Sequence, residues 1–118
     1  MFKVMEFTHE DLIAIRIGEK IEKKDFEKLD PLLEKVKKDH GKARLYIELE
    51  KITDTEPVAM WEDFKTYLSN AGSFKRIAVV GQNGMQQIIT KATGPFISGE
   101  LKYFPHGDSR NAMRWIEE

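Results

Sequence analysis

The sequence contains no cysteine. This excludes disulfide frameworks, thiolate metal sites and cysteine nucleophiles, and it fits a reducing compartment. Long apolar runs are missing as well, because none approaches the roughly 20 residues that a membrane-spanning helix needs. Residues 1–6 have the character of a strand and not of a signal peptide, since they lack a long apolar segment and a small-residue cleavage site. We therefore expect a cytoplasmic protein.

An excess of charge of one sign is also missing. The chain has 19 Lys and Arg residues against 20 Asp and Glu residues, for a net charge of −1. That balance lacks the basic surface of a duplex-DNA binder, so we expect no nucleic-acid partner. Apolar residues make up 41% of the 118 residues, which is enough for one continuous core. We therefore expect a single domain that spans residues 1–118.

Groupings of catalytic and metal-binding residues are scarce. The histidines His9, His40 and His106 are scattered and have no metal-ligand spacing, whereas a zinc site needs three or four ligands. No serine stands in a Gly-x-Ser-x-Gly turn. We therefore expect solvent-facing histidines and no catalytic residue, metal or cofactor. Several acidic residues lie close together in the sequence, and we interpret them as mixed-charge surface: Glu48, Glu50, Asp54, Glu62 and Asp63.

Several segments have the patterns of β-strands. Residues 2–7 and 12–17 are apolar or β-branched and flank a polar turn, which predicts a hairpin. Residues 43–49 alternate between apolar and polar side chains, so this strand is expected to have one less buried face. Residues 77–80 form a continuous apolar run that is typical of a strand buried on both sides. Residues 101–104 mark a last strand.

The first helical pattern runs from residue 23 to residue 39, with apolar side chains at spacings of three and four. Pro31 interrupts it. We favour one kinked helix because the apolar stripe crosses the proline; the alternative is a helix that starts at Pro31 and is capped by Asp30. Gly41 is expected to close it with a left-handed cap.

Three further helices are expected: one opening at Pro57, one over residues 84–92, and a short one capped by Asp108. The element order is then β-β-α-β-α-β-α-β-α. Strands that are separated by helices are mostly parallel, because each crossover returns the chain in the same direction. The sequence therefore predicts an α/β fold with a mixed, mostly parallel five-stranded sheet and four helices.

This order, together with several phrases, resembles the SpoIIAA-like family, a branch of the STAS-like fold. The phrases cover nearly the whole chain: Asp25, Leu29 and Pro31 in the first helix, GKARL at residues 41–45, WEDFK at 61–65, FKRIAVVG at 74–81, and residues 112–115. The resemblance implies similarity to the lipid-carrying CRAL-TRIO fold. It also implies a non-enzymatic module that holds an apolar ligand or meets a membrane surface.

The leading site hypothesis is a pocket for an apolar or amphiphilic small molecule, such as a lipid, between two helices and the sheet. Methionine is adaptable, and tryptophan can cover a ligand while its N–H stays in water. The alternative is that these residues are simply core, because an apolar stripe at helical spacing usually reflects burial. The predicted lining residues are Met60, Trp61, Phe64, Met85, Ile88, Ile89 and Phe96.

Two turns are weaker candidates. Gly81, Asn83 and Gly84 follow a buried strand and open a helix, where backbone N–H groups can bind an anion; a plain strand-to-helix turn is the alternative. Thr53 and Thr55 stand where STAS antagonists carry a phosphorylated serine in an Asp-Ser-Ser-Gly-like turn. This chain has neither serine nor glycine there, and helix capping is the alternative role for the threonines.

A second class of function stays open. The helix that opens at Pro57 and the loop before it could form a STAS-like protein–protein interaction or regulatory surface. The same surface would serve self-association, and we expect a homodimer. Peripheral contact with a membrane is a further expectation, based on the mildly basic C-terminal part of the chain.

Overall fold

The fold is taken from a computed structural model that describes residues 2–18, 23–50, 57–71, 74–81 and 99–118. Within these residues, five strands form one sheet in the order β1-β2-β3-β4-β5. β1 runs antiparallel to β2, and the pairs from β2 to β5 are parallel. The strands are β1 (Phe2–Val4), β2 (Leu12–Ile17), β3 (Ala43–Leu49), β4 (Phe74–Gly81) and β5 (Glu100–Pro105). This confirms the predicted mixed, mostly parallel sheet.

Two strand predictions need correction. β1 ends at Val4 and not near Phe7, because Glu6 and Phe7 already belong to the turn toward β2. β3 was expected to have a less buried face, but Tyr46 and Glu48 on that face are buried. The alternating pattern of β3 misleads because a helix covers its second face, and a tyrosine and a paired carboxylate can both be buried under such a cover.

The helices are α1 (Lys23–Glu27), α2 (Asp30–His40), α3 (Pro57–Ala71) and α5 (Ser109–Glu117), which a short 3-10 turn, η2 (His106–Asp108), precedes. The predicted helix over residues 84–92 lies outside the described residues. Among the described residues, no helix is long and apolar enough to cross a membrane. Asp108 stands at the N-cap position of α5, as predicted, but its side chain makes no capping hydrogen bond.

The first helical segment is two helices and not one kinked helix. Pro31 lacks an N–H and its ring would clash with the carbonyl four residues earlier, so α1 ends before it. Both earlier interpretations were wrong in detail, because α2 starts at Asp30 and its N-cap residue is Leu29. Pro31 then falls in the first turn, where N–H groups have no intrahelical partner. Gly41 closes α2 with a φ of 84°, as predicted.

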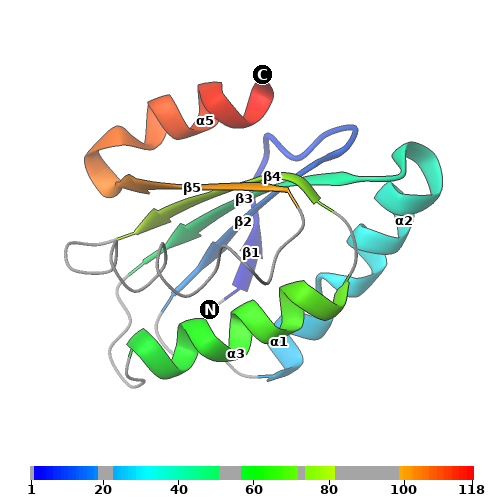
Figure 1. The fold of residues 1–118 in the computed structure, drawn as a ribbon, viewed down its shortest axis with the longest axis horizontal. Helices are drawn as coiled ribbons and strands as arrows, with labels where there is room; N and C mark the ends of the chain where they lie inside the picture. The colour runs from blue at the N-terminus through cyan, green and yellow to red at the C-terminus, as the bar shows by residue number, and fades with distance from the viewer. Residues whose placement is uncertain (1, 19–22, 51–56, 72–73, 82–98) are drawn as a thin grey trace.

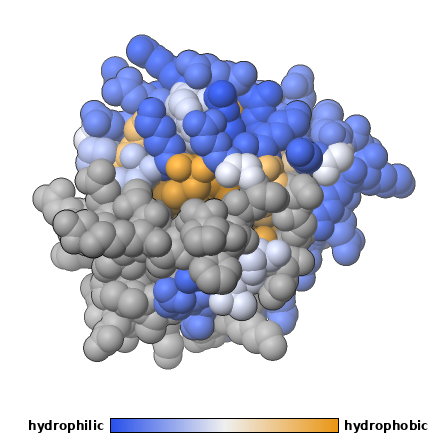
Figure 2. Space-filling model, in the orientation of Figure 1, coloured by the Kyte–Doolittle hydropathy of each residue, from blue (hydrophilic) through white to orange (hydrophobic). Residues whose placement is uncertain are grey.

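The helices cover the two faces of the sheet unequally. α1, α2 and α3 lie on one face and α5 lies on the other (Figure 1). Right-handed crossovers between strands laid down in sequential order place the connecting helices on the same face, which leaves the C-terminal helix to cover the opposite one. In the same orientation, Figure 2 shows hydrophilic surface over α5 and apolar residues gathered beneath it.

Each face has its own apolar cluster. On the α1–α3 face, Ile13, Ile15 and Ile17 of β2 pack with helix residues such as Leu33 and Phe64. On the α5 face, Ala14 and Ala78 lie in register on either side of Tyr46 of the central strand β3. The buried members there are Leu12, Ala14, Tyr46, Ala78, Val80, Phe104, Ala112 and Ile116.

Candidate functional site

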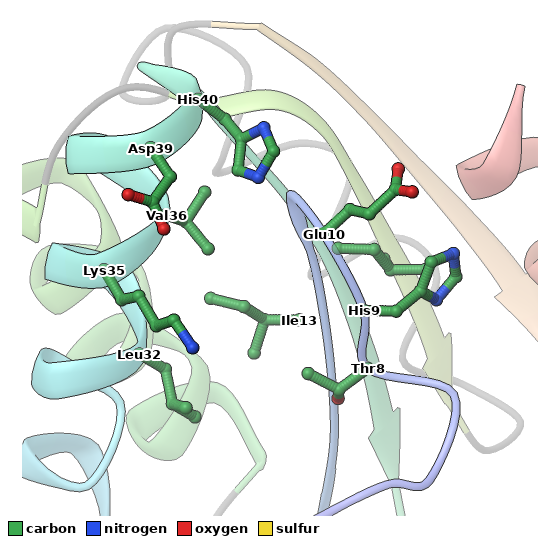
Figure 3. Close-up of a pocket in the computed structure, with 10 residues that line it drawn as sticks. Thr8, His9, Glu10, Ile13, Leu32, Lys35, Val36, Asp39 and His40 are labelled. Carbon is green, nitrogen blue, oxygen red and sulfur yellow. The ribbon is translucent and has the colours of Figure 1, made fainter.

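A pocket of about 320 Å³ lies between α2 and the turn that joins β1 to β2. Figure 3 shows its lining residues, which come from the two elements that face each other across it. One wall is the side of α2 that faces the hairpin, and the other is the turn with the first residues of β2. Its lining residues are Thr8, His9, Glu10, Leu12, Ile13, Leu32, Lys35, Val36, Asp39 and His40.

The turn that forms one wall is fixed by local hydrogen bonds. Thr8 Oγ1 accepts a hydrogen bond from the N–H of Ala14 at 2.9 Å and donates one to its carbonyl at 3.1 Å. The backbones of His9 and Leu12 exchange two further hydrogen bonds. Glu10 adopts a positive φ of 53°, a conformation that non-glycine residues adopt mainly in tight turns. These bonds hold the wall in place, so the pocket is part of the hairpin and not of a loose loop.

The floor of the pocket is apolar. Ile13 is 1% exposed and Val36 is 6% exposed, and both belong to the main hydrophobic cluster. Leu32 lies one turn before Val36 on α2 and packs against that cluster while it stays half-buried. The apolar stripe of α2 and the first part of β2 therefore place three apolar side chains at the bottom of the recess.

The rim of the pocket is charged. Figure 3 shows Lys35 and His40 directed from α2 into the recess, with Ile13 between the two walls. The carboxylate of Glu10 is turned away from the recess. Among the described residues, neither Lys35 nor His40 forms an ion pair or a side-chain hydrogen bond. Lys35 and His40 thus direct nitrogens into the recess that form no hydrogen bond or ion pair with the described residues, beside the carboxylate of Asp39 on the same helix.

His9 is turned away from the recess and connects the turn to α5. Its Nδ1 lies 2.6 Å from the carbonyl oxygen of Phe7, and its Nε2 lies 3.5 Å from a carboxylate oxygen of Glu117. The hydrogen bond to the Phe7 carbonyl, followed by the negative charge of Glu117, raises the pKa of His9. Protonation of His9 is therefore coupled to contact between the turn and the end of α5.

A second charged group lies at the carboxyl ends of the parallel strands, where α/β sheets commonly bind ligands. Arg16 and Glu48 are paired in register on β2 and β3, and Arg16 donates from Nε and Nη2 to Glu48 Oε2 at 3.1 and 3.0 Å. Arg16 also meets Glu50 at 3.2 Å, and His106 lies 3.8 Å from Glu48. The hydrogen bond with Glu48 raises the pKa of Arg16. We call these four residues the carboxyl-edge cluster.

The carboxyl-edge cluster corrects one sequence interpretation. Glu48 was assigned to mixed-charge surface, but it is 6% exposed. Its burial is compatible with charge because Arg16 supplies two hydrogen bonds. Among the described residues, no group of three His, Asp or Glu side chains is placed to hold a metal ion.

The opposite, amino edge of the sheet carries a network that holds α5 in place. Asp11 contacts Arg44 at 3.2 Å and Lys75 at 3.1 Å. Arg44 donates to the carbonyls of Ile116 and Glu117, and Arg76 donates to the carbonyl of Trp115. Cations at a helix C-terminus satisfy free carbonyls and favour the helix dipole. This network is structural, since it attaches α5 to β3 and β4.

The predicted apolar pocket is only partly described. Phe64 is fully buried and meets the ring of Phe26 edge-on at 5.1 Å, so it belongs to the core around α1 and α3. Met60 and Trp61 lie within α3, but their side chains lie outside the described residues. The pocket therefore stays a prediction. Its other proposed members also lie outside the described residues: Met85, Ile88, Ile89 and Phe96.

The two predicted turns remain largely untested. Gly81 is the last residue of β4, and a Cβ there would lie 2.9 Å from the ring of Tyr103, so packing requires a glycine at this position. Asn83 and Gly84 lie outside the described residues, as do Thr53 and Thr55. All three histidines are exposed, as predicted.

Sequence reasoning missed the pocket beside α2. Lys35 and His40 look like ordinary members of a charged helix face, and nothing in their spacing points to a recess. The usable signal was Leu32, an apolar residue at the edge of the stripe that Leu33 and Val36 define. An apolar position beside the main stripe indicates that something other than the sheet borders that side of the helix.

Comparisons with known proteins agree with this fold. The family model described as SpoIIAA-like matches residues 12–117. A crystal structure of an uncharacterized protein from the DUF3478 family, with a SpoIIAA-like fold, from Shewanella loihica PV-4 is similar to this chain. The two share 26% sequence identity with a TM-score of 0.62, over 98% of this chain and 92% of the other. Among curated proteins, no sequence matches this chain.

Proposed function

We propose that this chain, which belongs to the SpoIIAA-like family, is a non-catalytic binding module for an apolar or amphiphilic small molecule. The SpoIIAA-like fold suggests a regulatory or interaction module, and members of the family are generally non-enzymatic. Binding of a small molecule is one way in which such a module receives a signal, because a ligand that prefers one state shifts the population toward it.

The observation that carries this proposal is the pocket beside α2. Its floor of Ile13, Leu32 and Val36 is apolar, and its rim carries Lys35 and His40. Small-molecule sites are usually concave and apolar with a few well-placed polar groups. An apolar floor under a polar rim fits a molecule that is itself apolar at one end and polar at the other.

The proposal is tested by native mass spectrometry of the protein purified from its own cells, followed by identification of any released compound. We expect a stoichiometric apolar or amphiphilic passenger. Leu32→Trp should displace it, because the larger side chain fills the recess. Lys38→Trp is the matched control, since Lys38 is exposed on α2 and does not line the pocket.

The outcomes separate two locations. A passenger that is lost only in Leu32→Trp supports the pocket beside α2. A passenger that persists in that variant supports the predicted site between α3 and residues 85–96, and Met60→Ala and Met85→Ala should then weaken it. A wild-type protein that carries no passenger and binds no amphiphile in titrations would contradict the proposal.

A protein-interaction function is the second candidate, and the carboxyl-edge cluster favours it. Glu48 is buried and fixes Arg16, while Glu50 and His106 have exposed side chains. A charged rim held by a buried partner is preorganised for electrostatic recognition of another protein. We expect Glu50→Lys to abolish binding of a purified partner that Glu34→Lys still binds. Equal loss of partner binding in both variants would show that the net charge of the protein, and not the carboxyl-edge cluster, controls the interaction.

Self-association, a cytoplasmic location and contact with a membrane surface belong to the same proposal. A dimer would form through the α3 surface, and sedimentation equilibrium across a concentration series measures it directly. Binding to anionic vesicles at low and high salt tests the membrane contact, because attraction between a protein and an anionic lipid surface weakens as salt screens it.

A further inference from the structure

We infer that the pocket beside α2 is an organic-anion site, selective for a short monocarboxylate whose apolar body lies on Ile13, Leu32 and Val36 and whose carboxylate meets Lys35. This inference rests on the proposed function, since it names the chemical class of the small molecule. It is drawn from where the lining side chains point, from which of them have ion-pair partners, and from the volume of the recess.

The charge of the ligand follows from the groups that face it. A lysine ammonium has three donors and no acceptor. Lys35 points into the recess and has no ion pair among the described residues. His40 points inward from the end of the same helix and adds a second nitrogen. An oxyanion would supply Lys35 with an acceptor, because among the described residues no carboxylate, Asp39 included, forms an ion pair with it.

The carboxylates at the rim set the limit of that charge. The side chain of Glu10 is turned away from the recess. Asp39 lines the recess from α2, on the same helix as Lys35 and His40. The carbonyls at the C-terminal end of α2 add further negative potential on that side. A monoanion gains from Lys35 at little cost under these conditions, while a phosphate dianion is repelled more strongly. The site therefore favours a carboxylate over a phosphate.

The size of the ligand follows from the volume. The recess measures about 320 Å³, at the lower end of the range of roughly 300–1,000 Å³ for small-molecule sites. A lipid with two acyl chains does not fit in it. A short chain does, and each methylene placed on the apolar floor should strengthen binding about fourfold.

The test uses three probes of equal chain length: hexanoate, hexanol and hexylamine. Their binding is followed by amide chemical shifts in NMR spectra of the full chain. We expect hexanoate to bind best, hexylamine to bind worst, and shifts to concentrate at Thr8, Ile13 and Val36. Lengthening to octanoate adds two methylenes and should raise affinity about 16-fold. Lys35→Met should weaken hexanoate about fivefold and leave hexanol unchanged.

Lys38→Met is the matched control, because it removes the same charge from the exposed side of α2. Equal binding of hexanol and hexanoate, or an unchanged affinity in Lys35→Met, would overturn the anion inference while the proposed binding function stands. Inorganic phosphate that binds as well as hexanoate at the same residues would overturn the preference for a carboxylate. A failure of all probes to perturb Ile13 and Val36 would overturn the pocket itself, and with it the observation that supports the proposed function.

Discussion

The two faces of the sheet differ in the kinds of residue that cover them. The face under α1, α2 and α3 is aliphatic and aromatic throughout, with Ile13, Ile15 and Ile17 of β2 fully buried against it. The face under α5 has two alanines at its centre, Ala14 and Ala78, and its cluster includes a tyrosine. On this second face the residues that surround the apolar cluster are charged and paired.

The difference shows how each layer is attached. The helices on the first face are attached by burial of apolar surface, which contributes about 25 cal/mol per Å² and does not depend on pH. α5 buries Ala112 and Ile116, and it is also anchored by Arg44 and Arg76 at its C-terminal carbonyls and by Asp11 behind Arg44. We therefore expect the stability of the α5 layer to change with pH and with substitutions that remove a charge. The stability of the first layer should change with substitutions that alter the volume of a buried side chain.

The largest loss of stability should come from removing a large buried side chain on the first face. Phe64→Ala removes a fully buried ring that packs against Phe26 and the sheet. A Phe-to-Ala change in a core costs about 3–5 kcal/mol, because it loses transfer free energy and leaves a cavity. Urea unfolding at several salt concentrations measures it. Thr66→Ala, on the exposed side of α3, is the control. A loss of unfolding free energy in Phe64→Ala that varied with salt would contradict the attachment of this layer by apolar burial.

The next effect concerns the buried ion pair at the edge of the second face. Glu48→Gln keeps the shape of the side chain but leaves Arg16 without its buried counter-charge. We expect a loss of about 1–3 kcal/mol in the free energy of unfolding, below the loss for a fully buried pair because Arg16 is partly exposed and still meets Glu50. Glu50→Gln should cost less than 1 kcal/mol. Equal costs for the two variants would show that the burial of Glu48 has no energetic role.

Much of the fold could be predicted from the sequence because its signals are local. Runs such as residues 12–17 and 77–80 are apolar enough to specify buried strands, and Pro57 and Gly41 mark helix ends by their backbone constraints. The break between α1 and α2 was harder to place. The apolar stripe continues across Pro31, and only the loss of the hydrogen bond at the proline decides that two helices form.

The site could be predicted less well, because it depends on which side chains meet across the fold. The burial of Glu48 needs Arg16, which lies 32 residues earlier and becomes a neighbour only through the parallel register of β2 and β3. The pocket beside α2 needs the turn of the hairpin to stand opposite Lys35. Neither relation leaves a pattern along the chain, and the predicted site at Met60 and Trp61 stays a prediction.

The anchor of α5 should be sensitive to acid. Burial alone would raise the pKa of Asp11, but the hydrogen bond from Lys75 and the charges of Arg44 and Lys75 outweigh it, and the net pKa is lowered. A carboxylate with a lowered pKa in the folded state contributes stability that is present above its unfolded pKa of 3.8 and is lost as pH falls through the folded value.

Asp11→Asn should therefore destabilise the protein by about 1 kcal/mol at neutral pH and have little effect in strong acid. Hydrogen exchange of the amides of α5 should rise at neutral pH in this variant, because Arg44 loses the group that orients it. The amides of α3 should not change. Equal acceleration in both helices would show that the network supports the whole fold and not the α5 layer in particular.

The smallest effect concerns the hydroxyl of Tyr46. It is fully buried beneath the α5 face and has no hydrogen-bond partner among the described residues. Burial, and then the charge of Glu48, raises the pKa of Tyr46. A buried hydroxyl without a hydrogen bond loses its hydration and gains no protein hydrogen bond in exchange, so it destabilises the fold. The ring of Tyr46 still packs edge-on against Phe7 at 5.0 Å.

Tyr46→Phe keeps the ring and removes only the hydroxyl. We expect a change between zero and about 0.5 kcal/mol toward greater stability, measured by urea unfolding beside Phe104→Leu as a packing control on the same face. A loss of about 1 kcal/mol would mean that the hydroxyl forms a hydrogen bond in solution, to water or to another part of the chain. In that case the α5 face would contain a buried polar contact in addition to the Arg44 and Arg76 anchors and the Arg16–Glu48 pair, and the contrast between the two faces would be sharper.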